Sequence, residues 1–510
     1  MKIRDNLASG MCRIALAVLI LIPVIPATIT AQNRGEELAE IGPELVIRDI
    51  TWEIDGRTRL WVLRNLLDLE EGLRFSSEEE LVEFLLEEQQ ILINQRELHT
   101  STISFTLEEP APEAHPEEIA EQPVSVHVYV KDTWNIIALP YARYDSNEGL
   151  LLSIRARDYN FFGTLQDLRI DLDYEFTDDE ENVVTLSADF SLPFEMLRRQ
   201  WALIMKQSLA VQDGDVDFRL GLGLEYYFGW AGMDWTAGVM QEYRYLSDDE
   251  YDDGYYLGNR FSLGSSLNTP ATLPLFGRLR YAPEVYSTVN YRPGGISEER
   301  KGVAVGFDQR LLAGRFNWVG NYRDGQTFRV GNDNEYNIET DTWQKELYGE
   351  IAIFRKLWHP DPERFPRAGV SGRVVSFYLL DGAPEDQDNA ARHARGILND
   401  RMNGDLGVFL NLDISVTLWT LRPIFEMQIG TFFDVAYVAD TRGDFYESTS
   451  FERERDLKFG SGIAVIGFPL FARSLFVRGS YGVDLDLVRK GMSPLDGRAR
   501  EIFIGLGHYY

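Results

Sequence analysis

The sequence predicts a mainly β protein, in which a transmembrane antiparallel β-barrel follows one small α/β domain. Three observations predict this fold. Long strands with a period of two recur from about residue 134 to the C-terminus, their connections alternate between short turns and acidic loops, and an apolar leader stands at the N-terminus. Such a chain crosses a membrane with strands rather than helices.

Composition excludes several other classes. The 510 residues include 81 acidic and 50 basic side chains, for a net charge of −31, and 44% of the residues are hydrophobic. That apolar content excludes general disorder. A chain with this excess of negative charge is not expected to bind nucleic acid, because phosphate backbones are bound by basic surfaces. A mean hydropathy of −0.23 excludes a bundle of membrane helices.

Residues 1–31 have the layout of a secretory signal peptide. Basic residues precede an apolar run, 14–31, which ends in small residues before Gln32. The alternative is a permanent anchor, which Pro23 and Pro26 disfavour because proline breaks a spanning helix. The sole cysteine, Cys12, lies before the apolar run. Cleavage would leave an exported protein without disulfides, for which a closed barrel would be a source of stability.

A linker, 32–44, leads to a small unit at 45–131 with the order β-α-α-β-β. Strand alternation marks 45–55, and helical spacing marks 58–69. Ser77 and Glu80 form the sequence pattern of a capping box at the start of a second helix. Two further strands, near 103–107 and 124–130, flank a loop rich in proline and glutamate.

The barrel is predicted at 134–510. In its clearest strand, 216–228, one face is apolar and the other carries charged residues and glycines. The strands run ten residues or more, whereas those of a soluble sandwich, the alternative, run about 5–6. About eighteen candidate strands lie between 136 and 510. Two of them could be hairpin extensions rather than spanning strands.

Four segments carry a family resemblance: 158–166 (DYNFFGTLQ), 394–418, which contains an Arg-Gly loop, 430–438 (GTFFDVAYV) and the end, EIFIGLGHYY. With the leader and the small unit, the chain resembles the BamA/TamA-type outer-membrane assembly and secretion superfamily. The resemblance implies one POTRA domain at 45–131 and a bacterial surface antigen barrel of sixteen strands. Two departures are Ile397, where an aromatic residue is usual, and Tyr510, where Phe is commoner.

The Arg-Gly loop predicts a clasp inside the barrel. Alternation places Asp413 and Asp434 on the lumenal side of neighbouring strands. Arg395 could bind both carboxylates through charge-assisted hydrogen bonds, and Gly396 would allow the backbone to bend. The alternative is an ordinary Arg-Gly pair, such as Arg478-Gly479 within a strand. The expected role is structural or conformational, not catalytic.

The last strand is predicted to close the barrel. One face of it carries Ile502, Ile504, Leu506, His508 and Tyr510. The resemblance implies that this strand is read by the assembly machinery and pairs with the first strand, near 135–144. Residues near Ile137 would then lie opposite 502–510, at a junction that could open sideways.

The resemblance implies an outer-membrane protein that assists insertion or translocation of proteins or envelope material. Its N-terminal domain would lie in the periplasm and bind extended clients, or act only as a spacer, and periplasmic partner proteins are possible. The alternatives are a passive channel, a surface binding protein or a barrel hydrolase. No enzyme activity or cofactor is expected, because none of the six histidines has metal or triad spacing. The acidic cluster 248–253 fits a solvated loop better than a cation site.

Overall fold

The structure, a computed structural model, describes residues 44–108, 121–145, 149–176, 182–247, 253–297, 300–358, 367–381, 393–398, 402, 404–439, 456–472 and 475–506. The predicted signal peptide, nearly all of the linker, most of the acidic cluster, His508 and Tyr510 lie outside these ranges.

The small N-terminal domain is a four-stranded sheet with two helices. Its elements are β1 (Glu44–Asp55), α2 (Leu60–Leu66), β2 (Arg74–Phe75), α3 (Glu78–Asn94), β3 (Leu98–Leu107) and β4 (Glu121–Asp132). The strand order is β2-β1-β4-β3, and β1 runs parallel to β4. The predicted order β-α-α-β-β is present, with the two-residue β2 added.

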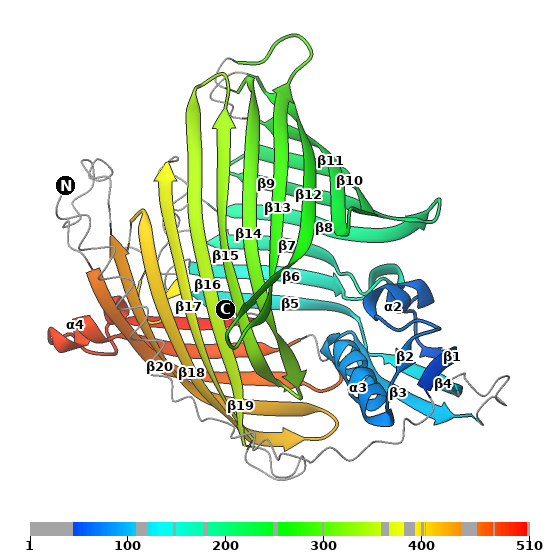
Figure 1. Cartoon of the computed structure of the whole chain (residues 1–510). Helices are drawn as coiled ribbons and strands as arrows, with labels where there is room; N and C mark the ends of the chain where they lie inside the picture. Colours follow the sequence, from blue (N-terminus) through cyan, green and yellow to red (C-terminus); the bar gives the residue numbers. More distant parts are fainter. Residues whose placement is uncertain are drawn as a thin grey trace, which may run out of the picture.

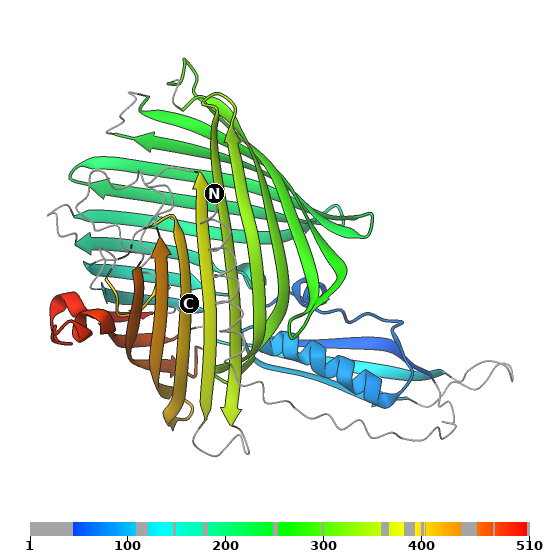
Figure 2. The ribbon, with the colours of Figure 1, turned by 60° about the vertical axis from the view of Figure 1, so that its left-hand side comes forward.

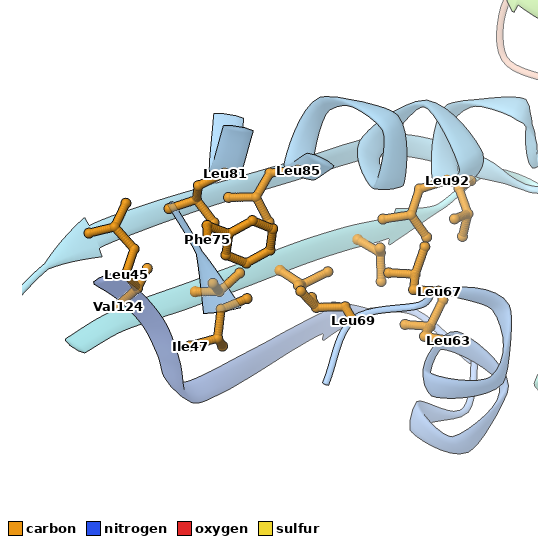
Figure 3. Close-up of a cluster of buried hydrophobic side chains, with 14 residues drawn as sticks. Leu45, Ile47, Leu63, Leu67, Leu69, Phe75, Leu81, Leu85, Leu92 and Val124 are labelled. Carbon is orange, nitrogen blue, oxygen red and sulfur yellow. The ribbon is translucent and has the colours of Figure 1, made fainter. Parts of the chain in front are cut away.

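One face of this sheet packs against both helices to form the domain's core (Figure 3). On α3, Leu81, Leu85 and Leu92 recur at helical spacing and are buried. Ser77 caps this helix by accepting a hydrogen bond from the Glu80 amide at 3.2 Å. The Glu80 carboxylate accepts from the amide of Ser76 rather than that of Ser77, so the predicted capping box is shifted by one residue.

Eighteen antiparallel strands of the described chain follow one another around the barrel (Figures 1 and 2). They are β5 (Ile136–Asp145), β6 (Gly149–Asp158), β7 (Leu168–Phe176), β8 (Val183–Met196), β9 (Arg199–Gln212), β10 (Asp215–Trp230), β11 (Met233–Leu246), β12 (Tyr255–Leu273), β13 (Gly277–Tyr291), β14 (Gly302–Val319), β15 (Tyr322–Asn337), β16 (Thr342–Trp358), β17 (Ala368–Asp381), β18 (Leu406–Leu421), β19 (Phe425–Ala439), β20 (Asp456–Pro469), β21 (Val477–Asp484) and β22 (Arg500–Leu506). Short helical turns η1 (Phe161–Gly163), α4 (Leu485–Arg489) and η5 (Gly497–Ala499) lie in two of the connections.

The expectation of sixteen strands is wrong, and the pattern count of eighteen is right for the part of the chain that the structure describes. No candidate is a hairpin extension, because each strand pairs with both of its neighbours in the ring. In the part of the chain that the structure describes, the ring is joined between β22 and β5 by two residue pairs, Phe503 with Asp145 and Ile504 with Tyr144. Along most of β5, this junction therefore has no ladder among the described residues.

The outer surface of the barrel carries an apolar belt. Large exposed side chains occupy paired positions on adjacent strands, such as Ile154 beside Leu172, and Val285 beside Leu263 and Phe307. The alternate positions face the lumen and carry charges. No described helix is long and apolar enough to cross a bilayer.

The small domain lies at one mouth of the barrel, and α4 lies at the opposite end (Figures 1 and 2). Because β5 leaves the small domain and β22 runs antiparallel to it, the connection that holds α4 belongs to the far rim. The two ends of the barrel are therefore distinguished by the chain itself.

Candidate functional site

Arg395 binds two carboxylates inside the barrel. Its Nε and a terminal nitrogen donate to the Asp434 carboxylate on β19 at 2.8 and 2.6 Å. The two terminal nitrogens also donate to the two oxygens of Asp413 on β18, one of them at 3.2 Å. The Arg395 backbone amide adds a hydrogen bond to Asp434 at 2.8 Å. The contact predicted from the sequence is present, and we call these three residues the lumenal clasp.

The clasp is buried unevenly. The side chains of Arg395 and Asp434 are 2% and 0% exposed, whereas that of Asp413 is 37% exposed. The guanidinium also lies over the ring of Phe432, 4.2 Å from its centroid. A buried ion pair recovers its desolvation cost only when hydrogen bonds satisfy both partners, and this geometry supplies them. Asp434 is therefore the anchor, and Asp413 is the outer partner.

Glycines allow the loop to lie directly against the barrel wall. Gly396 has φ of +86°, and a Cβ there would come within 2.8 Å of the Val483 amide nitrogen. On the wall beneath, a Cβ at Gly460 would lie 1.9 Å from the Arg395 carbonyl oxygen, and one at Gly482 would lie 2.6 Å from the Gly396 Cα. The loop thus needs small residues on β20 and β21 as well as its own glycine.

Apolar and polar contacts fix the remainder of the loop. Ala394, Ile397 and Met402 are buried with Phe409 of β18 in one cluster. The Asn411 side chain donates to the His393 carbonyl at 2.9 Å. Ile397, which departs from the family pattern, is fully buried. Its position is filled by an aliphatic side chain, while the aromatic contact to Arg395 comes from Phe432 on the wall.

The same loop is tied to the closing strand. The Gly396 amide donates to the carboxylate of Glu501 on β22. Glu501 stands two residues before Phe503, which forms the junction with β5. The loop therefore contacts strands β18 to β22 as one unit, and it reaches the edge of the ring.

The junction between β22 and β5, which we call the seam, has a short ladder among the described residues. Within those residues, strands β21 and β22 share seven residue pairs, whereas β22 and β5 share two. The described pairs place Asp145 and Tyr144 opposite Phe503 and Ile504, whereas Ile137 lies beside Arg157 of β6. The predicted pairing of residues near Ile137 with the last strand is therefore not among the described pairs.

The other residues of the predicted closing face can be placed in part. Ile502 and Leu506 pair with Tyr481 and Val477 of β21, and Ile504 is 51% exposed on the outer surface. His508 and Tyr510 lie outside the described residues.

The small domain docks on the barrel at two places. In the first, the segment after β1 meets the turn between β6 and β7. Arg57 forms an ion pair with Asp158 at 2.8 Å, and Arg59 Nε donates to the Phe162 carbonyl at 2.8 Å. Asn160, which is fully buried, donates to Thr58 and Asp132. The DYNFFGTLQ motif is therefore the docking turn of the small domain.

In the second, the end of α3 meets the turn between β14 and β15. The Asn94 side chain accepts from the Trp318 amide at 2.9 Å and donates to Asn317 at 3.0 Å. Arg96 donates to the Gly320 carbonyl at 3.1 Å and lies over the Trp318 ring, 4.5 Å from its centroid. These two docking sites lie on strands far apart in the ring, so the domain braces the mouth from two sides.

Within the described ranges, no group of His, Cys, Asp and Glu side chains could hold a metal ion. Asp253, the described member of the acidic cluster, accepts hydrogen bonds from the amide and hydroxyl of Ser297 and pairs with Arg292 at 3.3 Å. It joins two loops of the far rim.

Several contacts of the loop and of the small domain were not predicted from the sequence. Gly460 and Gly482 have a signal, because lumenal glycines on adjacent strands indicate close approach by another backbone. No sequence signal distinguishes Glu501, Asn94 and Arg96 from other polar residues.

Fold and site together define a class: an eighteen-stranded antiparallel barrel with a buried Arg–Asp clasp in its lumen and an α/β domain braced across one mouth. No family model and no curated protein matches the sequence. Among solved structures, CdiB from Acinetobacter baumannii is similar, with 12% identity, a TM-score of 0.48 and coverage of 91% of this chain and 74% of that chain. CdiB from Escherichia coli has 9% identity, a TM-score of 0.44 and coverage of 93% of both chains. BamA from Haemophilus ducreyi lacking POTRA domains 1–3 has 11% identity, a TM-score of 0.40 and coverage of 91% and 85%.

Proposed function

We propose that this protein is an outer-membrane barrel that assists the insertion or translocation of other proteins or envelope material. The observation that carries the proposal is the seam, where the described residues form two ladder pairs beside a strand that the clasp loop contacts through Glu501. Every ladder bond broken in lipid leaves backbone groups that lipid cannot satisfy, so a short ladder opens at the lowest cost. The clasp would hold one side of such an opening rigid.

The apolar belt supports the membrane location. Its exposed residues include Leu222 at 51%, Phe261 at 53% and Ile463 at 53%. A soluble protein rarely leaves so large an apolar surface in water, whereas a barrel in lipid requires it. The small domain would then lie on the periplasmic side.

The small domain offers a surface for an extended client. Strand β3 is an edge of its sheet, and pairs only with β4 among the described strands. Beside it, α3 exposes Leu86 at 59% and Ile93 at 38%. A client strand added to β3 would gain backbone hydrogen bonds and could place apolar side chains against the helix.

Depletion of the protein tests the proposal. We expect a defined set of outer-membrane or surface proteins to fall in abundance, measured by quantitative proteomics of the envelope. A photo-crosslinker placed at Thr102 of β3 should capture members of the same set, and one placed at His127 of β4, which has strand partners on both sides, serves as the control. Unchanged envelope composition after depletion would refute the proposal.

A passive channel is the second candidate, favoured by the charged lumen. Arg157 pairs with Asp171 at 2.6 Å and Arg260 with Glu284 at 3.2 Å on the inner wall. A channel should conduct steadily in planar bilayers, and its conductance should change when Arg260 is neutralised. Envelope composition would then remain normal after depletion.

A further inference from the structure

The segment between β21 and β22, residues 485–499, differs in charge from the remainder of this acidic chain. We call it the rim segment. Together with the adjoining Arg500, it carries four basic residues, Arg489, Lys490, Arg498 and Arg500, against two acids, Asp486 and Asp496. Both acids are engaged by backbone amides, those of Phe459 at 3.2 Å and Arg498 at 3.0 Å. Arg489, Lys490 and Arg498 are exposed.

The rim segment leaves the barrel wall below the end of the neighbouring strand. The last pair between β20 and β21 joins Gly460 to Asp484, and β20 continues past this pair through residues 456–459. Four residues of a tilted strand rise roughly 10 Å. The rim segment therefore begins at a depth where the neighbouring strand is still part of the barrel wall.

The rim segment folds outward over the lipid-facing surface. Tyr481 pairs with Ile463, which is 53% exposed on the outer face of the barrel. The Tyr481 hydroxyl donates to the Pro494 carbonyl at 2.7 Å, so the returning half of the segment lies on this outer face. In both views α4 projects away from the wall rather than across the lumen (Figures 1 and 2).

Its apolar residues are exposed at the same level. Leu495, next to Pro494, is 71% exposed, and Leu485 at the start of α4 is 36% exposed. Leucines beside arginine and lysine, at the depth of a membrane interface, are the composition of an interfacial anchor. Basic side chains there extend to the headgroups, and guanidinium groups bind phosphate through bidentate hydrogen bonds.

We propose that the rim segment binds phosphate-bearing lipids of the outer leaflet, through Arg489, Lys490 and Arg498, beside the seam. The proposal rests on the membrane location under the proposed function and goes beyond it. A bound lipid would cover Leu485 and Leu495 and would lie against β21 and β22, the strands that border the junction with β5. The protein would thus select the lipid beside the seam, where the ladder of the described residues is shortest.

The test uses the full chain in vesicles of phosphatidylcholine that contain a minor fraction of labelled phosphatidylglycerol. We expect the wild type to enrich the labelled lipid around itself, measured by energy transfer from protein tryptophan. Since each basic residue at an anionic surface contributes roughly a fivefold preference, the triple variant Arg489→Gln, Lys490→Gln, Arg498→Gln should lose about tenfold or more of it. Inorganic phosphate at millimolar concentration should not compete, because the leucines need an acyl chain.

The control variant neutralises three exposed basic residues of the small domain, Arg48→Gln, Arg64→Gln and Lys131→Gln, and should keep the preference. Equal enrichment by the wild type and the triple variant would overturn the proposal, and so would full competition by inorganic phosphate. Failure of the wild type to insert into vesicles would overturn both this proposal and the membrane location. Insertion without lipid preference would overturn this proposal alone and leave a protein neighbour as the occupant of the segment.

Discussion

Replacing Arg395 with alanine tests the lumenal clasp. The change removes four side-chain hydrogen bonds, two of them to Asp434, whose side chain is fully buried. Breaking a buried ion pair on one side costs about 3–5 kcal/mol, because the remaining charge is uncompensated. With an unfolding entropy of about 2 cal/mol/K per residue, that loss lowers the Tm of a barrel of this size by only about 5 °C.

The effect on function should be larger than this shift in Tm. Without the ion pairs, the loop keeps only the bond from its backbone amide to Asp434 on β19, which weakens its hold on Glu501 at the seam. We expect residues 393–398 to exchange amide hydrogens much faster, and the depleted envelope proteins to stay depleted in a strain that carries the variant.

The matched control is Arg260→Ala. Arg260 also forms a lumenal ion pair, with Glu284 at 3.2 Å, but on β12, which lies between β11 and β13 in the ring and is not among the strands that the loop contacts. It should cost stability without loss of function. Normal envelope composition with Arg395→Ala, or an equal loss with both variants, would refute the role of the clasp.

Three further predictions follow from single contacts. Gly460→Ala should displace the loop without changing any charge, because its Cβ would lie 1.9 Å from the Arg395 carbonyl; Gly479→Ala, whose Cβ would meet only one atom at 4.0 Å, should be silent in the same exchange and complementation assays. Burial raises the pKa of Glu88, which is 4% exposed and accepts from the Asp68 amide at 2.9 Å. The folded state binds the Glu88 proton more tightly than the unfolded state does, so the small domain should lose stability as the pH rises from about 4.5, the ordinary pKa of a glutamate, through the raised pKa. Glu88→Gln should remove that loss, and identical hydrogen exchange of wild type and variant at each pH would contradict this. Arg96→Ala should loosen the docking of α3 on the turn between β14 and β15, seen as a broader distance distribution between spin labels on Glu87 and Asp324; an unchanged distribution would show that Asn94 suffices.

The fold could be predicted because alternation and strand length are local properties of the sequence. The outward set of β10, from Val216 to Phe228, is apolar at every second position, and the structure keeps that register throughout its ladder with β9. The number of strands does not follow in the same way, because the family resemblance implies sixteen strands whereas the alternation gives about eighteen. Pairing on both sides, which the sequence does not encode locally, decides it.

The candidate site could be predicted in part. Arg395, Asp413 and Asp434 follow from alternation and from the resemblance of one loop, and their contact is present. The pairing of the last strand with the first was predicted and is present, but its register could not be predicted, because the register depends on the stagger between the two strands. The docking contacts of the small domain depend on how two folding units are placed relative to each other. Nothing in the sequences of 57–59 and 158–163 indicates that these segments contact each other.

A disulfide across the seam tests the central claim most directly. Tyr144→Cys and Ile504→Cys would join the two paired residues, and the sole natural cysteine, Cys12, lies in the leader. Leu222→Cys with Gln241→Cys, a pair within the ladder of β10 and β11, is the control. We expect that oxidation of the seam pair alone depletes the dependent envelope proteins, and that reduction restores them. Full activity with the seam locked would contradict lateral opening and favour the passive channel.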